Sequence, residues 1–151
     1  FTTFGHLLVP YWTERFGLPV PFLHGGVAKK DRDQMVAQFQ AQRDQPGLML
    51  LSLRAGGTGL TLTAANHVVH LDRWWNPAVE NQATDRAFRI GQRRNVQVYK
   101  MITAGTLEES IQDILDGKTQ LAGAVVGEGE GWLTELDPDQ LAALMSYRGR
   151  E

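Results

Sequence analysis

The sequence predicts an α/β domain in which helices flank a parallel sheet. Short apolar runs alternate along the chain with longer segments of helical periodicity, which is the pattern of βαβ units. One of these runs, Leu48–Leu53, is apolar in the way expected of a strand buried on both faces. The chain has 151 residues and 42% hydrophobic content, so it can hold one ordinary core.

The first predicted helix runs from about Gly5 to Phe16. Its apolar residues recur at helical spacing, at Leu7, Leu8, Tyr11, Trp12 and Phe16. Pro10 is tolerable only near the first turn, because proline has no N–H to donate. Phe1–Phe4 resembles the tail of a strand whose first half is missing, and the chain has no initiator Met. We therefore expect a fragment of a longer chain.

Strands and helices then alternate. The predicted strands are Val20–Leu23, Leu48–Leu53, Val68–Asp72 and Val96–Ile102. A helix is expected over Asp31–Gln42, with Met35, Val36 and Phe39 on its apolar face. Ligands of such sheets bind beyond the carboxyl ends of the strands. The loops after Leu53 and Asp72 should therefore share one functional edge.

Capping residues mark two further helices. Asn76 is a good N-cap and Pro77 a good first residue, so a helix should begin there and run through Arg86. Thr106–Glu109 is a capping box that opens a third long helix. We accordingly expect a main lobe over residues 1–105 and a helical extension over 106–151. In that extension, residues 127–131 form a turn and Asp137–Gln140 opens a last short helix.

Composition excludes several classes of protein. Charged residues make up 21% of the chain and the net charge is −2, which argues against disorder and gives no support from net charge for DNA binding. There are no cysteines, and the 4 histidines have no metal-ligand spacing, so we expect no metal site within the chain. No apolar run approaches the length of a membrane span, and we expect no membrane partner.

The most informative stretch is Gln82–Gln92. Arg86 and Arg89 should lie on one helix face and aim two guanidinium groups at one anionic target. Arginine suits that task because its planar fork is always charged and matches phosphate oxygens. The alternative is an exposed helix with ordinary surface salt bridges.

Residues 56–59 form a glycine-rich turn after a predicted strand, which by itself is weak support for a phosphate site. The turn lacks the Gly-Lys-Ser/Thr ending of a P-loop. Gly117-Lys118-Thr119 has that ending, but Gln112 stands where the opening glycine belongs and a helical segment precedes it. We expect a break near a helix end there, and no nucleotide site.

These segments together resemble the second RecA-like lobe of the Swi/Snf family of ATPase motors, within the superfamily-two helicases. Leu51–Gly59 is similar to motif V, Asp72–Pro77 to the Trp-Asn-Pro segment after it, and Gln82–Gln92 to motif VI. Phe1–Phe4 resembles the end of motif IV, and the segment with His24, Gly25, Gly26, Arg32 and Phe39 resembles the family's next segment. The motifs occur in the family's order and cover almost the whole chain.

The resemblance implies a nucleotide site shared between two lobes. ATP and Mg²⁺ would be held mainly by a first lobe, because the P-loop lysine, its hydroxyl neighbour and the second acidic residue are not here. Arg89 would be the arginine finger, Arg86 its partner, and Gln82 would help to hold the network. Arg54, Gly57 and Gly59 would complete the nucleotide side as motif V elements that link nucleotide to DNA. A structural salt bridge remains the alternative for Arg86.

The resemblance also implies contacts to the phosphate backbone of double-stranded DNA, made without reading sequence. The candidates are Thr2, Thr3, His24, Gly25, Lys29, Lys30, Arg32 and Thr58. A solvated surface is the alternative for Lys29 and Lys30. For Trp74 and Trp75 we expect one core role and one surface or interlobe role, and no base stacking.

The implied function is the C-terminal motor lobe of a double-stranded DNA translocase or remodeller, a DNA-dependent ATPase when both lobes are present. Its partners would be DNA, the N-terminal RecA-like lobe and DNA-bound proteins. The alternatives are a lobe of a strand-separating helicase and an inactive binding module. Phe88 departs from the His usual in eukaryotic members, which with the doubled Trp resembles bacterial members. We expect a bacterial, cytoplasmic, nucleoid-associated protein.

Overall fold

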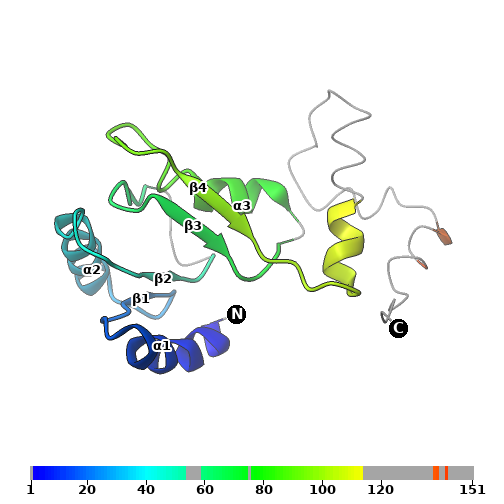
Figure 1. The fold of residues 1–151 in the computed structure, drawn as a ribbon, viewed down its shortest axis with the longest axis horizontal. Coiled ribbons are helices and arrows are strands. Elements are labelled where there is room, and N and C mark those ends of the chain that lie inside the picture. Colours follow the sequence, from blue (N-terminus) through cyan, green and yellow to red (C-terminus); the bar gives the residue numbers. More distant parts are fainter. Residues whose placement is uncertain (1, 54–58, 75, 114–137, 140–141, 143–151) are drawn as a thin grey trace. The chain divides into compact units, whose positions relative to one another are not determined.

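The computed structural model describes residues 2–53, 59–74, 76–113, 138–139 and 142 (Figure 1). In chain order the elements are α1 (Thr2–Phe16), β1 (Phe22–Leu23), α2 (Lys29–Ala41), β2 (Leu50–Leu51), β3 (His67–His70), α3 (Pro77–Thr84) and β4 (Gln97–Lys100). Residues 107–113 are also helical. The alternation of helices and strands confirms the predicted α/β class, although each strand is shorter than its apolar run.

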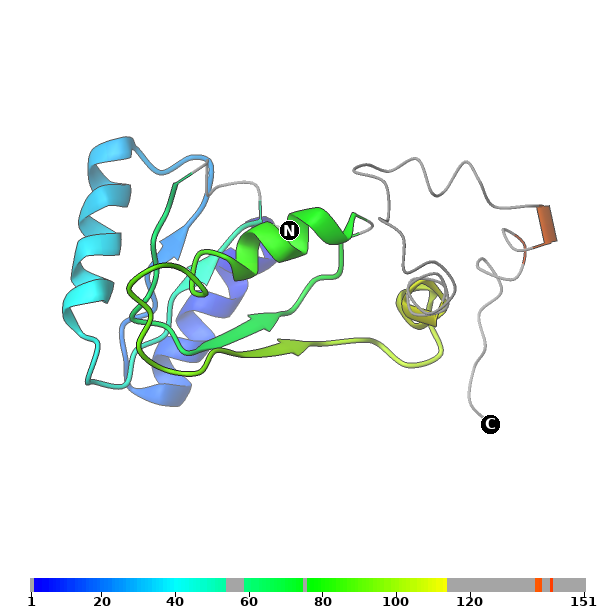
Figure 2. The same ribbon diagram turned by 90° about the horizontal axis from the view of Figure 1, so that it is seen from above.

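The strand pairs are parallel, as predicted. β1 pairs with β2, with Phe22 opposite Leu50 and Leu23 opposite Leu51. β3 pairs with β4 (Figure 2). The Gln97 N–H donates to the Asn66 carbonyl at 2.9 Å, and the Met101 N–H donates to the His70 carbonyl at 2.9 Å. Because the bonded positions advance in the same direction on both strands, this second pair is parallel too.

The chain divides into two compact units. Unit 1 comprises Phe1–Val68 and Asn81–Tyr99, and unit 2 comprises Val69–Glu80 and Lys100–Glu151. Among the described residues, the buried apolar ones of unit 1 are Val20, Phe22, Leu23, Leu62, Ala64 and Ala87, and Ile111 is buried in unit 2. The expected boundary between residues 105 and 106 stays a prediction.

The prediction that Phe1–Phe4 ends a strand is wrong for Thr2–Phe4, which form the first turn of α1. Pro10 consequently lies inside the helix instead of near its start. It lacks the N–H that would donate to the His6 carbonyl, and the helix continues to Phe16 without that bond. Local β propensity at Thr2–Phe4 is overridden by tertiary packing, which propensities do not contain.

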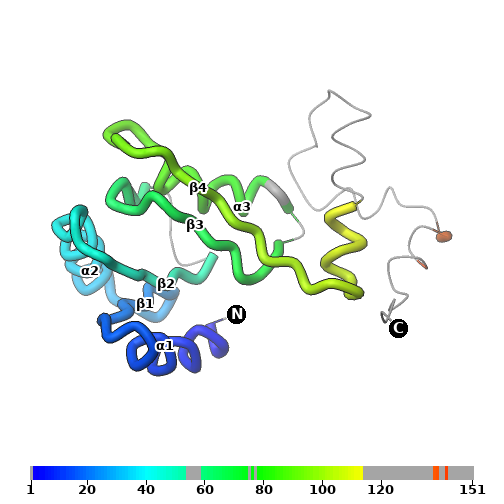
Figure 3. Tube along the Cα trace, viewed as in Figure 1, coloured from blue at the N-terminus to red at the C-terminus, as the bar shows by residue number. Residues whose placement is uncertain are grey.

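That packing centres on Gly5, the buried residue of α1. A Cβ atom at Gly5 would lie 2.4 Å from Cζ of Phe22 on β1, so the missing side chain is what lets α1 approach the strand. Figures 1 and 3 show α1 running beside β1. The rings of His6, Phe22 and His24 close the contact, with centroids 5.1 Å (His6–Phe22), 5.0 Å (His6–His24) and 4.9 Å (Phe22–His24) apart.

The predicted helix caps are present with one change. Asn76 Oδ1 accepts the Ala78 N–H at 2.9 Å, so Asn76 is the N-cap of α3. Thr106 Oγ1 accepts the Glu108 N–H at 3.3 Å before the helix at 107–113. The Glu109 carboxylate accepts the Gly105 N–H at 2.8 Å, one residue before the position that a capping box uses.

Two predictions concern the rest of the extension and the membrane. Of the expected last helix, Pro138, Asp139 and Ala142 are helical, and the expected turn at 127–131 and the Gly117–Thr119 segment lie outside the described residues. Among the described helices, none is long and apolar enough to span a membrane.

Replacing Gly5 with Ala should destabilise the protein although alanine favours helices. Overpacking against Phe22 costs about 1–3 kcal/mol, which exceeds the roughly 1 kcal/mol that alanine gains over glycine in a helix. Urea unfolding of Gly5→Ala should show a lower midpoint, and adding Phe22→Leu should restore part of it. The control is Gly25→Ala, where nothing lies within 4 Å of the added Cβ. An unchanged midpoint in Gly5→Ala would contradict this close contact.

Candidate nucleotide and nucleic-acid interface

The interface is built on an irregular segment, Leu60–Ala65, which leads from the glycine-rich turn to β3. Leu62, Thr63 and Ala64 are buried, yet the segment belongs to no strand or helix. Its buried backbone polar groups must therefore find partners outside a regular ladder. We call it the core loop.

One set of partners comes from the end of α2. The Ala64 N–H donates to Gln40 Oε1 at 2.7 Å, and Gln40 Nε2 donates to Thr63 Oγ1 at 3.2 Å. Arg43, just beyond the helix, donates to the same hydroxyl at 3.2 Å. These bonds fix the core loop against α2, and no part of the sequence pattern indicated them.

A second set comes from the segment similar to motif VI. The Leu62 N–H donates to the Arg86 carbonyl at 2.7 Å. Arg89 Nη1 donates to the Leu60 carbonyl at 3.3 Å and to Thr61 Oγ1 at 3.4 Å. Arg94 donates to the Ala64 carbonyl. The motif VI-like segment and Arg94 thus bond directly to the core loop, which follows the motif V-like segment in the chain.

The expectation that Arg86 and Arg89 share one α-helical face is wrong. α3 ends at Thr84, and the chain continues in turns. The Ala87 N–H donates to the Thr84 carbonyl at 3.0 Å, an i→i−3 bond that tightens the end of the helix. The Arg86 carbonyl, which would continue an α-helical ladder, is instead bonded to Leu62 of the core loop.

The two arginines consequently lie in different environments. Arg86 is only 7% exposed and donates from Nη2 to the Leu53 carbonyl at 3.5 Å, directly before the glycine-rich turn. Burial lowers the pKa of its guanidinium. Arg89 is exposed, and so is Gln82 on α3. Within the described residues, the hydrogen bonds of Arg89 go only to the core loop. Among the described residues, its other nitrogens have no hydrogen-bond partner.

Gln92 is a residue whose role the sequence did not reveal. Its Nε2 donates to the carbonyls of Ala65 at 2.7 Å and Ala87 at 3.1 Å. Its Oε1 accepts the N–H groups of Arg93 at 2.9 Å and Arg94 at 3.0 Å. Gly91 before it has φ +102°, a conformation that favours glycine. The Gly-Gln pair was a visible signal, because the glycine permits the turn and the amide has both donors and acceptors.

Of the other candidates for the nucleotide side, Arg54 and Gly57 lie outside the described residues, as does Thr58 among the DNA candidates. Gly59 is exposed with φ +116°, so this position also favours glycine.

The remaining DNA candidates lie in unit 1. Thr2 and Thr3 are exposed in the first turn of α1, and Lys29 and Lys30 are exposed in the first turn of α2. The other three are His24 and Gly25, which lie in the loop before α2, and Arg32, which lies in the first turn of that helix. Within that loop, the Gly26 N–H donates to His24 Nδ1 at 3.2 Å, and the Val27 N–H donates to the His24 carbonyl at 3.0 Å.

Arg32 is half-buried and donates from Nη2 to the Val27 carbonyl at 3.3 Å. The structure thus brings His24, Gly25 and the start of α2 together. Arg32 stabilises the loop through its bond to Val27, whereas Lys29 and Lys30 are exposed in the first turn of α2.

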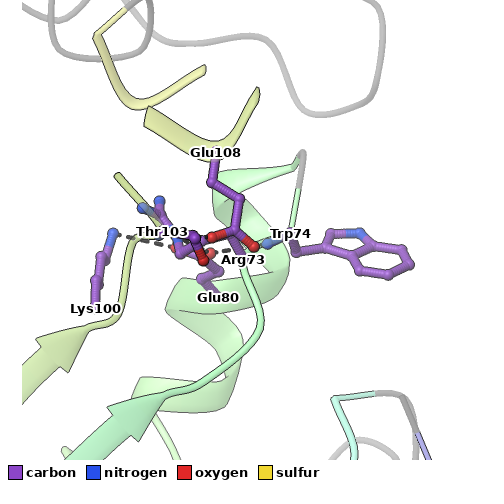
Figure 4. Close-up of polar contacts among 6 residues, drawn as sticks. All are labelled: Arg73, Trp74, Glu80, Lys100, Thr103 and Glu108. Carbon is purple, nitrogen blue, oxygen red and sulfur yellow. Dashed lines mark hydrogen bonds and ion pairs between the residues drawn. The ribbon is translucent and has the colours of Figure 1, made fainter. Parts of the chain in front are cut away.

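Unit 2 contains a buried ionic cluster that sequence reasoning missed (Figure 4). Glu80 on α3 is 1% exposed, and its Oε1 accepts Arg73 Nε at 2.8 Å and the Trp74 N–H at 3.0 Å. Its Oε2 accepts Arg73 Nη2 at 3.3 Å and lies 3.2 Å from Lys100 Nζ on β4. An acidic residue near the start of a helix has many possible roles, so only the fold identifies this one.

The cluster shifts two pKa values. Burial alone would raise the pKa of Glu80, but the hydrogen bonds from Arg73 and Trp74 and the charges of Arg73 and Lys100 lower it overall. Burial lowers the pKa of His70, although the Glu80 charge opposes this and the charges of Lys100 and Arg73 add to it.

Residues 1–91 match the family described as the helicase conserved C-terminal domain. The chain belongs to this family. A Bacillus subtilis protein whose name describes an ATP-dependent helicase/translocase is 53% identical over 142 residues, which cover 94% of this chain and 15% of that protein.

Two solved structures from Sulfolobus solfataricus identify the branch of the family. The SWI2/SNF2 ATPase core domain is 38% identical with a TM-score of 0.78, over 99% of this chain and 30% of that one. The same core in complex with double-stranded DNA is 41% identical with a TM-score of 0.76, over 97% of this chain and 30% of that one. The chain is therefore a RecA-like C-terminal lobe of the Swi/Snf type, as the resemblance implied, and it spans a minor part of the length of these relatives.

Stability of this helicase lobe should fall with acid in two steps. Both shifted groups have a folded pKa below the ordinary value, so the unfolded chain binds more protons and stability is lost as pH falls. The first loss should begin below the ordinary His70 pKa of 6.5. The second should begin below the ordinary Glu80 pKa of 4.5. Urea unfolding at a series of pH values measures both.

His70→Gln should flatten the upper step and leave the lower one. His67→Gln on the same strand is the matched control, since His67 is exposed. An upper step of equal size in wild type and His70→Gln would contradict the assignment.

Proposed function

We propose that this chain is the C-terminal motor lobe of an ATP-dependent translocase of double-stranded DNA. The observation that carries the proposal is the placement of Arg89, an exposed guanidinium group tethered through one nitrogen to the core loop directly after the glycine-rich turn. An exposed arginine that is tethered through one nitrogen suits an anionic ligand that arrives from outside the lobe.

In this proposal Arg89 is the arginine finger that reaches the γ-phosphate of ATP. The nucleotide and Mg²⁺ would be held mainly by the N-terminal RecA-like lobe, which supplies the P-loop. Arg86 would position the glycine-rich turn through the Leu53 carbonyl, and Gln82 would support the pair. The motif V elements Arg54, Gly57 and Gly59 would connect the nucleotide to DNA.

The DNA side of the proposal uses the phosphate backbone. Exposed lysines and hydroxyl groups at the starts of α1 and α2 suit contacts that do not read bases. The residues proposed are Thr2, Thr3, His24, Gly25, Lys29, Lys30, Arg32 and Thr58. The likeness to a SWI2/SNF2 core in complex with double-stranded DNA supports duplex DNA as the partner. DNA-bound proteins are the proposed further partners.

The finger assignment is tested by Arg89→Ala in the protein that contains both lobes. Loss of an arginine finger costs on the order of 10³ to 10⁵ in rate, or about 4–7 kcal/mol of transition-state stabilisation. DNA-stimulated phosphate release should be abolished while DNA affinity stays within a few-fold. Arg89→Lys should also largely fail, because a point charge cannot replace the planar fork. Arg93→Ala, at an exposed neighbour, is the control. Turnover by Arg89→Ala near that of the control would reject the assignment.

Triplex displacement and fork unwinding separate a translocase from a strand-separating helicase. A motor that tracks a duplex need not melt base pairs, each step of which costs about 1.4 kcal/mol in stacking. The two-lobe protein should therefore displace the third strand of a triplex with ATP and leave a forked duplex intact. Its affinity for DNA should fall steeply with salt, because phosphate contacts release counterions. Efficient fork unwinding without triplex displacement would favour the helicase alternative.

A further inference from the structure

The carboxylate of Glu80 bonds to two consecutive residues of the loop between β3 and α3, Arg73 and Trp74. Four donors converge on Glu80, and they come from three places: the side chain of Arg73, the backbone N–H of Trp74 and the side chain of Lys100. Figure 4 shows the Trp74 indole directed away from the carboxylate that holds its backbone. Glu80 thus anchors the main chain at a half-buried tryptophan whose ring points away from the carboxylate.

The pairing also removes Arg73 from the set of possible phosphate contacts. Its side chain is only 9% exposed, and two of its nitrogens are bonded to the carboxylate. In the structure, its charge is turned inward.

The chemistry of the cluster favours positioning over stability as its role. Burying an ion pair is often no better for stability than an apolar replacement, because desolvation offsets the attraction. Nη1 of Arg73 is moreover buried with no hydrogen-bond partner among the described residues, which costs stability. What the cluster supplies is geometry, since a bidentate guanidinium and a backbone N–H on one carboxylate permit few loop conformations.

We infer that Glu80 is a positioning residue that holds the Trp74 backbone, and that the DNA-dependent part of ATP turnover requires the loop in that conformation. The loop follows the carboxyl end of a parallel strand, the edge at which α/β sheets bind ligands. A second carboxylate secures the neighbouring chain, because Glu108 accepts the Thr103 N–H at 2.9 Å beyond β4 (Figure 4). The link to turnover rests on the proposed function.

The decisive variant is Glu80→Gln, which keeps the shape of the side chain. An amide has one oxygen and one NH₂ group, whereas all four contacts of Glu80 require an acceptor. In either orientation of the amide, its NH₂ group replaces one acceptor oxygen and faces the donors that this oxygen had bound, so those contacts are lost. In the protein with both lobes, DNA-stimulated turnover should fall on the order of 10- to 100-fold, the effect of misplacing a supporting group by about 1 Å. Basal turnover and the KM for ATP should be unchanged.

Two matched variants separate positioning from general damage. Glu109→Gln alters another carboxylate of unit 2 that accepts a backbone N–H, at 2.8 Å from Gly105, and should keep full stimulation. Lys100→Met removes the ion pair to Glu80 Oε2 and leaves the bond between Glu80 Oε1 and the Trp74 N–H in place. The loss of DNA-stimulated turnover in Lys100→Met should therefore be much smaller than in Glu80→Gln. A loss in Lys100→Met as large as in Glu80→Gln would overturn the inference, as would equal losses of basal and stimulated turnover.

A spectroscopic measurement reads the loop itself, independently of catalysis. In protein labelled with 5-fluorotryptophan, the resonance of Trp74 is identified by its loss in Trp74→Phe. Glu80→Gln should shift or split that resonance, and Glu109→Gln should leave it in place. An unmoved resonance in Glu80→Gln would refute the positioning role even if turnover fell. If the wild type showed no DNA-stimulated ATPase at all, the proposed function and the link to turnover would fail, and the resonance would still decide whether Glu80 holds the loop.

Discussion

The core loop Leu60–Ala65 is the constraint on which the candidate site depends. Buried backbone without a regular ladder must be satisfied group by group. Here the partners are Gln40 of α2 and a series of groups between Arg86 and Arg94. Each of these residues must keep its position for the loop to stay buried, so the need for hydrogen bonds ties α2, the core loop and the segment from Arg86 to Arg94 together.

This arrangement places Arg86 and Arg89 in different environments, which suit different roles. Arg86 is buried and bonded to the chain just before the glycine-rich turn, where it suits a structural task. Arg89 is exposed and bonded to the Leu60 carbonyl, where it suits a ligand. In the proposed motor, a change at the nucleotide would act on the chain on both sides of the glycine-rich stretch. It would act on Leu53 through Arg86 and on Leu60 through Arg89. In unit 2, too, a hydrogen bond between a side chain and the backbone restrains a loop. The Glu80 carboxylate accepts the Trp74 N–H in the loop that follows β3.

The sequence was sufficient for the features that depend on local chemistry. The parallel pairing, the Asn76 cap and the helix start at Thr106 follow from burial pattern and capping rules, and the structure contains them. It was insufficient where distant partners decide the conformation. Thr2–Phe4 are helical because α1 packs at Gly5 onto Phe22, and α3 ends early where the Arg86 carbonyl bonds to Leu62. The roles of Gln40, Gln92 and Glu80 likewise appear only when residues far apart in the chain are brought together.

In the proposed motor, Arg89 meets the transferred phosphate of a nucleotide bound by another lobe. Arginine-specific modification with phenylglyoxal, read residue by residue by mass spectrometry, tests it in the protein that contains both lobes. Arg89 should react freely in the nucleotide-free protein and be protected when ADP, aluminium fluoride and double-stranded DNA are bound together, because the analogue reproduces the charge of the transition state. Arg93, an exposed neighbour outside the proposed site, should react equally in both states. Equal modification of Arg89 with and without the analogue would contradict the account.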